Sequence, residues 1–141
     1  MPSLTWAVVE DPADDDILAV RRRLIQSNLA ASSIGDSRDL AVLVRDAGGQ
    51  AVAGVTGTVW GSCLEIGFVW VHDAWRGQGV GRRLMDVMEA EARQRGCRVI
   101  SLDTYTFQAP DFYRKLGYQE FGRVGGYPDG VEKVFMRKEL A

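Results

Sequence analysis

Three glycines, Gly77, Gly79 and Gly81, stand where a segment with helical apolar spacing begins. The turn therefore lies at a helix N-terminus, where backbone N–H groups lack acceptors inside the helix and the helix dipole adds positive potential. Glycine also lets an anion approach the chain without meeting a Cβ atom. The spacing predicts a pyrophosphate site formed by Arg76, Gly77, Gln78, Gly79, Val80 and Gly81.

Two well-known phosphate-binding motifs do not fit this turn. The dinucleotide-binding pattern G-x-G-x-x-G requires a third glycine where Leu84 stands, and the P-loop requires lysine where Arg82 stands. The pattern that remains is Arg-x-x-Gly-x-Gly, from Arg76 to Gly81. It resembles the acyl-CoA pyrophosphate loop of the GNAT N-acetyltransferase superfamily.

The resemblance covers residues 39 to 139 and includes the order of strands and helices around the turn. The segment LDTYTFQAPDFYRKLGYQEFG is also similar to a bacterial subgroup whose acceptors are mostly unassigned. The resemblance therefore implies an acyltransferase that uses acetyl-CoA as its co-substrate.

The elements that position the turn are predicted from periodicity. Apolar, β-branched and aromatic runs bounded by glycine-rich turns predict strands, and apolar residues at helical spacing predict helices. The predicted strands are 4–9, 39–46, 51–61, 63–71, 98–105, 118–124 and 131–138, and the predicted helices are about 14–29, 79–95 and 110–116. This order predicts an α/β (α+β) fold with a mixed, mostly antiparallel sheet flanked by helices.

Strands 63–71 and 98–105 are joined by the long helix, so they are predicted to run parallel. If they splay at their ends, the pantetheine arm of CoA fits between them, and the backbone of Val69 and Val71 can pair with its amides. The family resemblance implies the same splayed pair, with a backbone N–H near Val71 polarising the acyl carbonyl. Ordinary buried valines would show the same side-chain pattern, so only the backbone role is functional.

Acyl transfer from a thioester to an amine requires a neutral amine, a stabilised oxyanion and a proton for the departing thiolate. The sequence contains no convincing Ser-His-Asp or Cys-His arrangement, as direct transfer without a protein nucleophile would show. The family resemblance places the general acid at Tyr113. A phenol with a pKa of about 10 is protonated at neutral pH and can donate to the thiolate. Tyr105 and Tyr118 are less well placed competitors.

Glu65 is the predicted base, because in a regular strand it shares a face with Val69 and Val71. A strand bulge would break that parity. In some members of the resembling family, a glutamate at this position deprotonates the acceptor through water. His72, the single histidine, is interpreted as a turn residue or a nucleotide neighbour, because it lies at the corner before the glycines.

Several other polar and aromatic residues lie near the expected site. Asp103 and Gln108 are expected at the substrate end of the site, and no chemical role is predicted for them. Many relatives carry an asparagine seven residues before the tyrosine, and Thr106 stands at that position here. The aromatic residues interpreted as core or sheet-face positions are Trp60, Phe68 and Trp70.

Length and composition bound the function. A chain of 141 residues with a net charge of -2 fits one domain over residues 1–141 and argues against a nucleic-acid partner. Cys63 and Cys97 have no metal-ligand spacing, so no metal is expected. The sequence shows no signal peptide or membrane-spanning run, so a cytoplasmic protein without a membrane partner is expected.

These features together predict an acetyl-CoA-dependent N-acetyltransferase in which a primary amine of a small molecule attacks the thioester directly. A protein acetyltransferase acting on lysine or an N-terminus fits equally well, because the residues before Asp39 contain no motif that defines an acceptor pocket. Outside the enzyme class, the alternatives are a non-catalytic acyl-CoA-binding or sensing module and an interaction subunit. Homodimerisation through the C-terminal strands is a further expectation drawn from the family.

Overall fold

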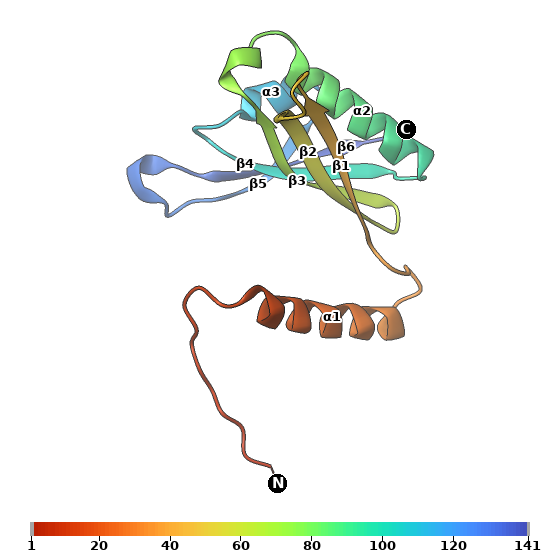
Figure 1. Ribbon diagram of the computed structural model, residues 1–141, viewed down its shortest axis with the longest axis vertical. Helices are drawn as coiled ribbons and strands as arrows, with labels where there is room; N and C mark the ends of the chain where they lie inside the picture. Colours follow the sequence, from red (N-terminus) through yellow and green to blue (C-terminus); the bar gives the residue numbers. More distant parts are fainter. Residues whose placement is uncertain (1, 141) are drawn as a thin grey trace. The chain divides into compact units, whose positions relative to one another are not determined.

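The computed structural model describes residues 2–140, which divide into one compact unit ending at Asp36 and another beginning at Ser37. Figure 1 shows the helix of the first unit and the sheet of the second. Within residues 2–140, no helix is long and apolar enough to cross a lipid bilayer. The prediction of one domain over residues 1–141 stays a prediction.

The first unit contains one helix, α1 (Asp14–Ala31), within the described residues. The helix begins after Ala13, whose carbonyl accepts hydrogen bonds from the N–H groups of Asp16 and Ile17. Three aspartates in the first turn complement the helix dipole, as predicted. The predicted strand over 4–9 is wrong, because these residues have no second strand in their unit to pair with and form no regular structure.

The second unit is built on a six-stranded sheet in the order β1-β2-β3-β4-β6-β5. All neighbouring strands are antiparallel except β3 and β4, which run parallel, as predicted. The strands are β1 (Arg38–Arg45), β2 (Ala51–Trp60), β3 (Cys63–Val71), β4 (Val99–Tyr105), β5 (Gln119–Val124) and β6 (Lys133–Glu139). The helices are α2 (Val80–Gln94) and α3 (Pro110–Lys115), with short 3-10 helices η1 (Asp73–Trp75) and η2 (Pro128–Gly130). Each of these strands and α-helices lies within two residues of its predicted bounds.

Helix α2 packs one apolar face against the sheet. Its buried side chains are Leu84, Met85, Met88 and Ala92. They join Leu64 of β3 and Ile100 of β4 in one core that also includes Tyr113 of α3. Complete burial of a side chain such as Leu64 contributes about 1.5–3 kcal/mol to stability. Helices α2 and α3 therefore cover the same face of the sheet, as Figure 1 shows.

The parallel strands β3 and β4 pair over a short stretch only. Residues 63–65 face residues 99–101, and the pairing ends there. Beyond this point β3 continues along β2 to Val71, and β4 continues along β6 to Tyr105. Because each strand stays with its antiparallel neighbour, the sheet opens between them. The predicted splay of the central pair is confirmed.

Strand β3 carries a bulge within the splayed stretch. Val55 of β2 faces Val69, whereas Gly57 faces Ile66, so β3 has one residue more than β2 between these pairs. The extra residue shifts the alternation of faces along the strand. Ile66 before the bulge and Val69 and Val71 after it therefore all pack against the core.

Thr56 holds this bulge in place. Its Oγ1 accepts a hydrogen bond of 2.9 Å from the backbone N–H of Phe68. A Cβ atom on Gly67 would lie 2.7 Å from the same oxygen, so this position requires glycine while the hydroxyl stays there. The shifted alternation leaves Phe68 and Trp70 exposed on the face away from α2, which fits the prediction of sheet-face aromatics.

Candidate functional site

A cavity of about 930 Å³ lies where β3 and β4 separate. Residues of both strands, of the segment after β4 and of α3 line it. Among its lining residues two side chains are charged, Arg76 and Asp103, and Tyr113 lines it from α3. Its volume is within the range of small-molecule sites, so the splay of the sheet creates room for a ligand.

The glycine-rich turn has the backbone geometry that an anion requires. Gly77 and Gly79 have positive φ angles of 74° and 79°, and no atom lies within 4 Å of a Cβ built on either. Gly79 is the N-cap of α2, and no side chain caps this terminus. The N–H of Arg83 makes the first bond to the Gly79 carbonyl. The three N–H groups before it, those of residues 80–82, have no acceptor inside the helix.

Side chains of the turn hold the scaffold in place. Arg76 Nε donates to the Val71 carbonyl at 3.1 Å, and its Nη1 lies 3.2 Å from the Asp73 carboxylate. Gln78 Nε2 donates to the Ala74 carbonyl at 3.2 Å. These bonds tie the turn to the end of β3 and to η1, so the surface that it offers a ligand is mostly backbone.

His72 forms the corner that leads into the turn. Its Nδ1 accepts a hydrogen bond of 3.0 Å from the Ala74 N–H, and its carbonyl accepts one from the Trp75 N–H. The interpretation of His72 as a turn residue is confirmed, because the side chain caps η1.

The free edge of β3 presents backbone groups to the opening. The His72 N–H donates to the Val52 carbonyl of β2 at 2.8 Å, so alternate residues of β3 bond to β2. Val69 and Val71 are the residues between, and their N–H and C=O groups point toward the splayed side. The Val71 carbonyl is used by Arg76, which leaves both groups of Val69 and the N–H of Val71 facing the opening.

Tyr113 lies on α3 with only 8% of its surface exposed. Its ring packs edge-on against the rings of Phe112 and Tyr118 at 5.1 and 5.9 Å. Burial raises the pKa of Tyr113 above its ordinary value, because the phenolate would lose its hydration. The phenol is therefore protonated throughout the neutral range and can act as a proton donor. Tyr118 is also buried, but it does not line the cavity.

Glu65 does not lie on the face expected for it. The predicted parity placed it with Val69 and Val71, and this is wrong because the bulge at Gly67 and Phe68 intervenes. Glu65 is exposed on the face away from α2 and is not among the residues that line the cavity.

Gln108 and Thr106 shape the segment between β4 and α3. Gln108 Oε1 accepts hydrogen bonds from the Tyr105 N–H at 2.9 Å and from the Thr104 hydroxyl at 3.2 Å. Thr106 Oγ1 accepts one of 3.1 Å from the Glu132 N–H. Gln108 lines the cavity and Thr106 does not, so the threonine ties this segment to the chain before β6.

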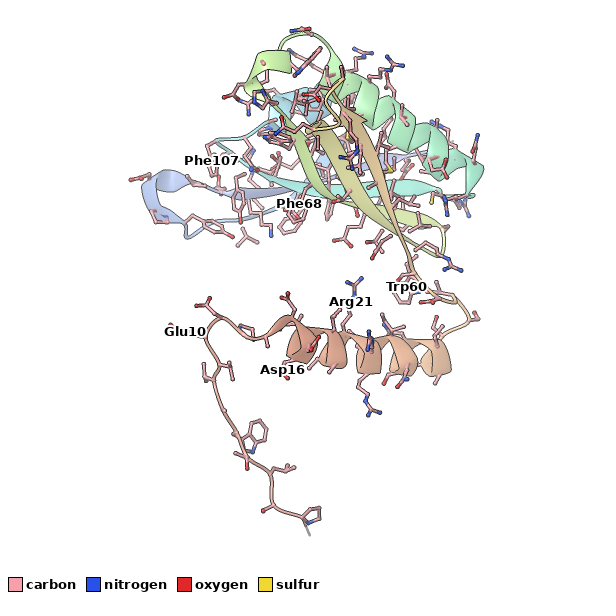
Figure 2. All side chains as sticks on the ribbon, in the orientation of Figure 1. Glu10, Asp16, Arg21, Trp60, Phe68 and Phe107 are labelled. Atoms are coloured by element: carbon pink, nitrogen blue, oxygen red, sulfur yellow. The ribbon has the colours of Figure 1, made fainter. Side chains whose placement is uncertain are left out.

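The aromatic residues that line the cavity were not predicted from the sequence as part of the site. Phe68 and Trp70 line the cavity from β3, and Phe107 lines it from the segment after β4. Figure 2 marks Phe68 and Phe107 on these two elements. No role was predicted for Phe107, which lies exposed just after β4, because the sequence alone does not show which side chains face the cavity.

The sequence and fold match known acetyltransferases. The profile of the Acetyltransferase (GNAT) family matches residues 6–118. An acetyltransferase of Agrobacterium fabrum is 31% identical over 134 residues, which cover 94% of this chain and 98% of that protein. The blasticidin-S acetyltransferase of Streptomyces morookaense is 37% identical over 93 residues, which cover 65% of this chain and 68% of that protein. The crystal structure of an acetyltransferase from Bacillus cereus has a TM-score of 0.78 and 33% identity, covering 95% of this chain and 98% of that one.

Proposed function

The chain belongs to the GNAT acetyltransferase family, and we propose that it transfers the acetyl group of acetyl-CoA to a primary amine of a small molecule. The observation that supports this best is one cavity that lies in the splayed sheet. It is lined by Arg76 of the glycine-rich turn, by the free edge of β3 and by the buried Tyr113. The proposed anion site, the edge of β3 and the proposed proton donor thus lie around one opening.

The residues of the turn fit the pyrophosphate of acetyl-CoA. The open space at Gly77 and Gly79 and the uncapped N-terminus of α2 suit two adjacent phosphates. In the proposal, residues 76–81 hold the pyrophosphate and the backbone of Val69 and Val71 pairs with the pantetheine amides. Acetyl-CoA supplies the acetyl group as a thioester.

Tyr113 is the proposed general acid. As the carbon–sulfur bond breaks, its phenol gives a proton to the departing sulfur, and the tyrosine regains a proton from solvent. The Val71 N–H is the proposed donor to the acyl oxygen. It is the last amide of β3 on the edge where β4 no longer pairs with the strand. No side chain of the protein forms a covalent bond in this scheme.

Glu65 is proposed to take the proton that the acceptor amine loses. Its carboxylate is exposed on the face of the sheet away from α2, and Asp103 of β4 lies on the same face. Since it does not line the cavity, the proton would pass through water. The ammonium form of the acceptor first loses a proton to solvent; the neutral amine then loses one proton to Glu65 as it forms the amide, and the thiolate gains one from Tyr113, so the two transfers balance.

A small-molecule acceptor is favoured over a protein acceptor by one of the relatives. The blasticidin-S acetyltransferase, 37% identical in the aligned region, is named for a small-molecule antibiotic. The cavity is also of a size that suits a compact ligand. A lysine or N-terminal amine of a protein is the alternative acceptor.

The test is release of CoA thiol from acetyl-CoA with a panel of small primary amines and lysine peptides. A reaction without acceptor measures hydrolysis, and mass spectrometry identifies the acetylated product. We expect amine-dependent release with a small molecule. Binding of acetyl-CoA without release by any acceptor would contradict the proposal and favour a sensing module, and acetylation of peptides alone would favour a protein substrate.

A further inference from the structure

The two charged side chains that line the cavity have opposite signs and different neighbours. Arg76 belongs to the glycine-rich turn and bonds to the end of β3. Asp103 lies on β4, where the alternation of buried and exposed residues directs it to the face away from α2. One side of the cavity therefore suits an anion and the other side suits a cation, as an ammonium group would be before it loses its proton.

The Asp103 carboxylate already has a primary ammonium beside it. Lys133 Nζ lies 3.7 Å from Asp103 Oδ1, 5.9 Å from the centre of the Tyr105 ring and 5.5 Å from the centre of the Phe135 ring. The pair is at the outer limit of an ion pair, and 40% of the Asp103 side chain is exposed. A carboxylate next to aromatic faces is thus a place that accepts an ammonium group, and it retains room for a second partner.

Aromatic side chains line the same cavity as this carboxylate. The ring of Tyr105 stacks on that of Phe107 at 5.5 Å with 9° between the planes. The ring of Tyr127 packs edge-on against the Tyr105 ring at 5.2 Å. Phe68 and Trp70 line the cavity from the opposite strand (Figure 2 labels Phe68). Such surfaces favour a planar or apolar ligand, because stacking and burial of apolar area both contribute.

Building on the proposed function, we propose that the acceptor is a singly charged primary amine carried on an aromatic ring. Asp103 binds its ammonium group, and the stacked rings of Tyr105 and Phe107 bind its flat body. Among the cavity-lining residues, all of which belong to the second unit, Asp103 is the only carboxylate, and one carboxylate matches a single ammonium group better than the several of a polycationic amino sugar. Lys133 competes with the substrate for Asp103.

The test measures amine binding to the full chain saturated with CoA, by isothermal titration calorimetry, so that no turnover is needed. The probes are 2-phenylethylamine, its neutral analogue 2-phenylethanol, hexylamine and the aminoglycoside kanamycin. We expect 2-phenylethylamine to bind at least about tenfold more tightly than each of the others, since it alone combines one charge with a ring.

Variants test which side chains bind 2-phenylethylamine. Asp103→Asn should raise the Kd of 2-phenylethylamine about tenfold, and Phe107→Leu about threefold. The matched controls are Asp86→Asn, an exposed carboxylate on α2, and Phe121→Leu, an exposed ring on β5, neither of which lines the cavity. Both should leave the Kd unchanged. Lys133→Met should lower the Kd, and this gain should vanish when Asp103 is already Asn.

Tighter binding of kanamycin, absence of binding by every amine, or equal effects of Asp103→Asn and Asp86→Asn would overturn the inference. Each of these results differs from failure of the proposed function, which is loss of transfer rather than of amine binding. A protein that binds 2-phenylethylamine through Asp103 but releases no CoA would keep this subsite and refute the transferase reaction.

Discussion

The proposed cofactor side of the cavity is made of backbone, whereas the acceptor side is made of side chains. On the first side, Gly77 and Gly79 leave open space and α2 offers N–H groups that no side chain caps. On the second side, the carboxylate of Asp103 and the stacked rings of Tyr105 and Phe107 form the wall. Both sides meet where β3 and β4 separate.

This difference explains why one side is recognisable in the sequence and the other is not. Backbone geometry needs particular residue types at fixed spacing, so it leaves a motif such as Arg-x-x-Gly-x-Gly. A wall of side chains depends on which strands are neighbours, and many residue types can fill it. Cofactor binding should therefore depend on the backbone conformation of the turn more than on its side chains, whereas acceptor binding should depend on side chains.

Gly79→Val should have the largest effect on cofactor binding. Gly79 has a φ of 79°, which a β-branched residue adopts only with strain, and its side chain would occupy the open space of the turn. We expect the Kd of acetyl-CoA to rise by about 100-fold in calorimetry. Gly122→Val on β5 is the control, because Gly122 has no neighbour within 4 Å of a Cβ and no positive φ. An unchanged Kd in Gly79→Val would contradict binding of acetyl-CoA by the backbone of the turn.

Buried tyrosines should make the protein less stable at high pH. Burial raises the pKa of both Tyr113 and Tyr118, on the α2 side of the sheet. Below pH of about 10 both phenols are protonated in the folded and unfolded states, and above it the unfolded state loses its protons first. The free energy of unfolding should then fall by up to about 1.4 kcal/mol per pH unit for each tyrosine.

Urea unfolding between pH 8 and pH 11 measures this slope. Tyr118→Phe should make it shallower, because one of the two groups is removed. A slope that is the same in Tyr118→Phe and in the unmodified protein would contradict the assignment of the pH dependence to these buried phenols.

Gly67→Ala should disturb the junction between the two sides. The new methyl group would lie 2.7 Å from Thr56 Oγ1, which holds the bulge through the Phe68 N–H. We expect a loss of about 1–3 kcal/mol in the free energy of unfolding, together with a lower kcat, because Val69 and Val71 would shift. Denaturant titration and CoA release measure both. Gly122→Ala is the control, and equal results in the two variants would show that the bulge is not required.

Arg76→Gln should have the smallest effect. The Arg76 side chain is 63% exposed, and its ion pair with Asp73 is at the surface, where such pairs contribute roughly 0–1 kcal/mol. Because the turn binds mainly through backbone, we expect the Kd of acetyl-CoA to rise by no more than about fivefold. A rise as large as that of Gly79→Val would mean that the cofactor side depends on side chains after all.

The secondary structure after residue 36 could be predicted because each element has a local signal. An apolar, β-branched and aromatic run defines β3, and helical spacing after Gly79 defines α2. The strand predicted over 4–9 failed because a strand also needs a partner, and the sequence pattern does not reveal whether one is available.

The site could be predicted only where it depends on local sequence. The glycine-rich turn and the backbone of Val69 were predicted from spacing and family resemblance, and their binding roles stay a prediction. The face of Glu65 was not, because the bulge results from the hydroxyl of Thr56 on a neighbouring strand. The contact between Asp103 and Lys133 likewise follows from the pairing of β4 with β6, two strands apart in the sequence.

The measurement that tests the central claim most directly is the effect of Tyr113→Phe on transfer and on binding. With an active amine, acetyl transfer in the variant should fall about 100-fold in kcat, because the departing thiolate loses its proton donor. The Kd of acetyl-CoA and the circular dichroism spectrum should stay the same, since phenylalanine keeps the ring in the core. A variant with unchanged kcat would contradict the role of Tyr113 and the mechanism built on it.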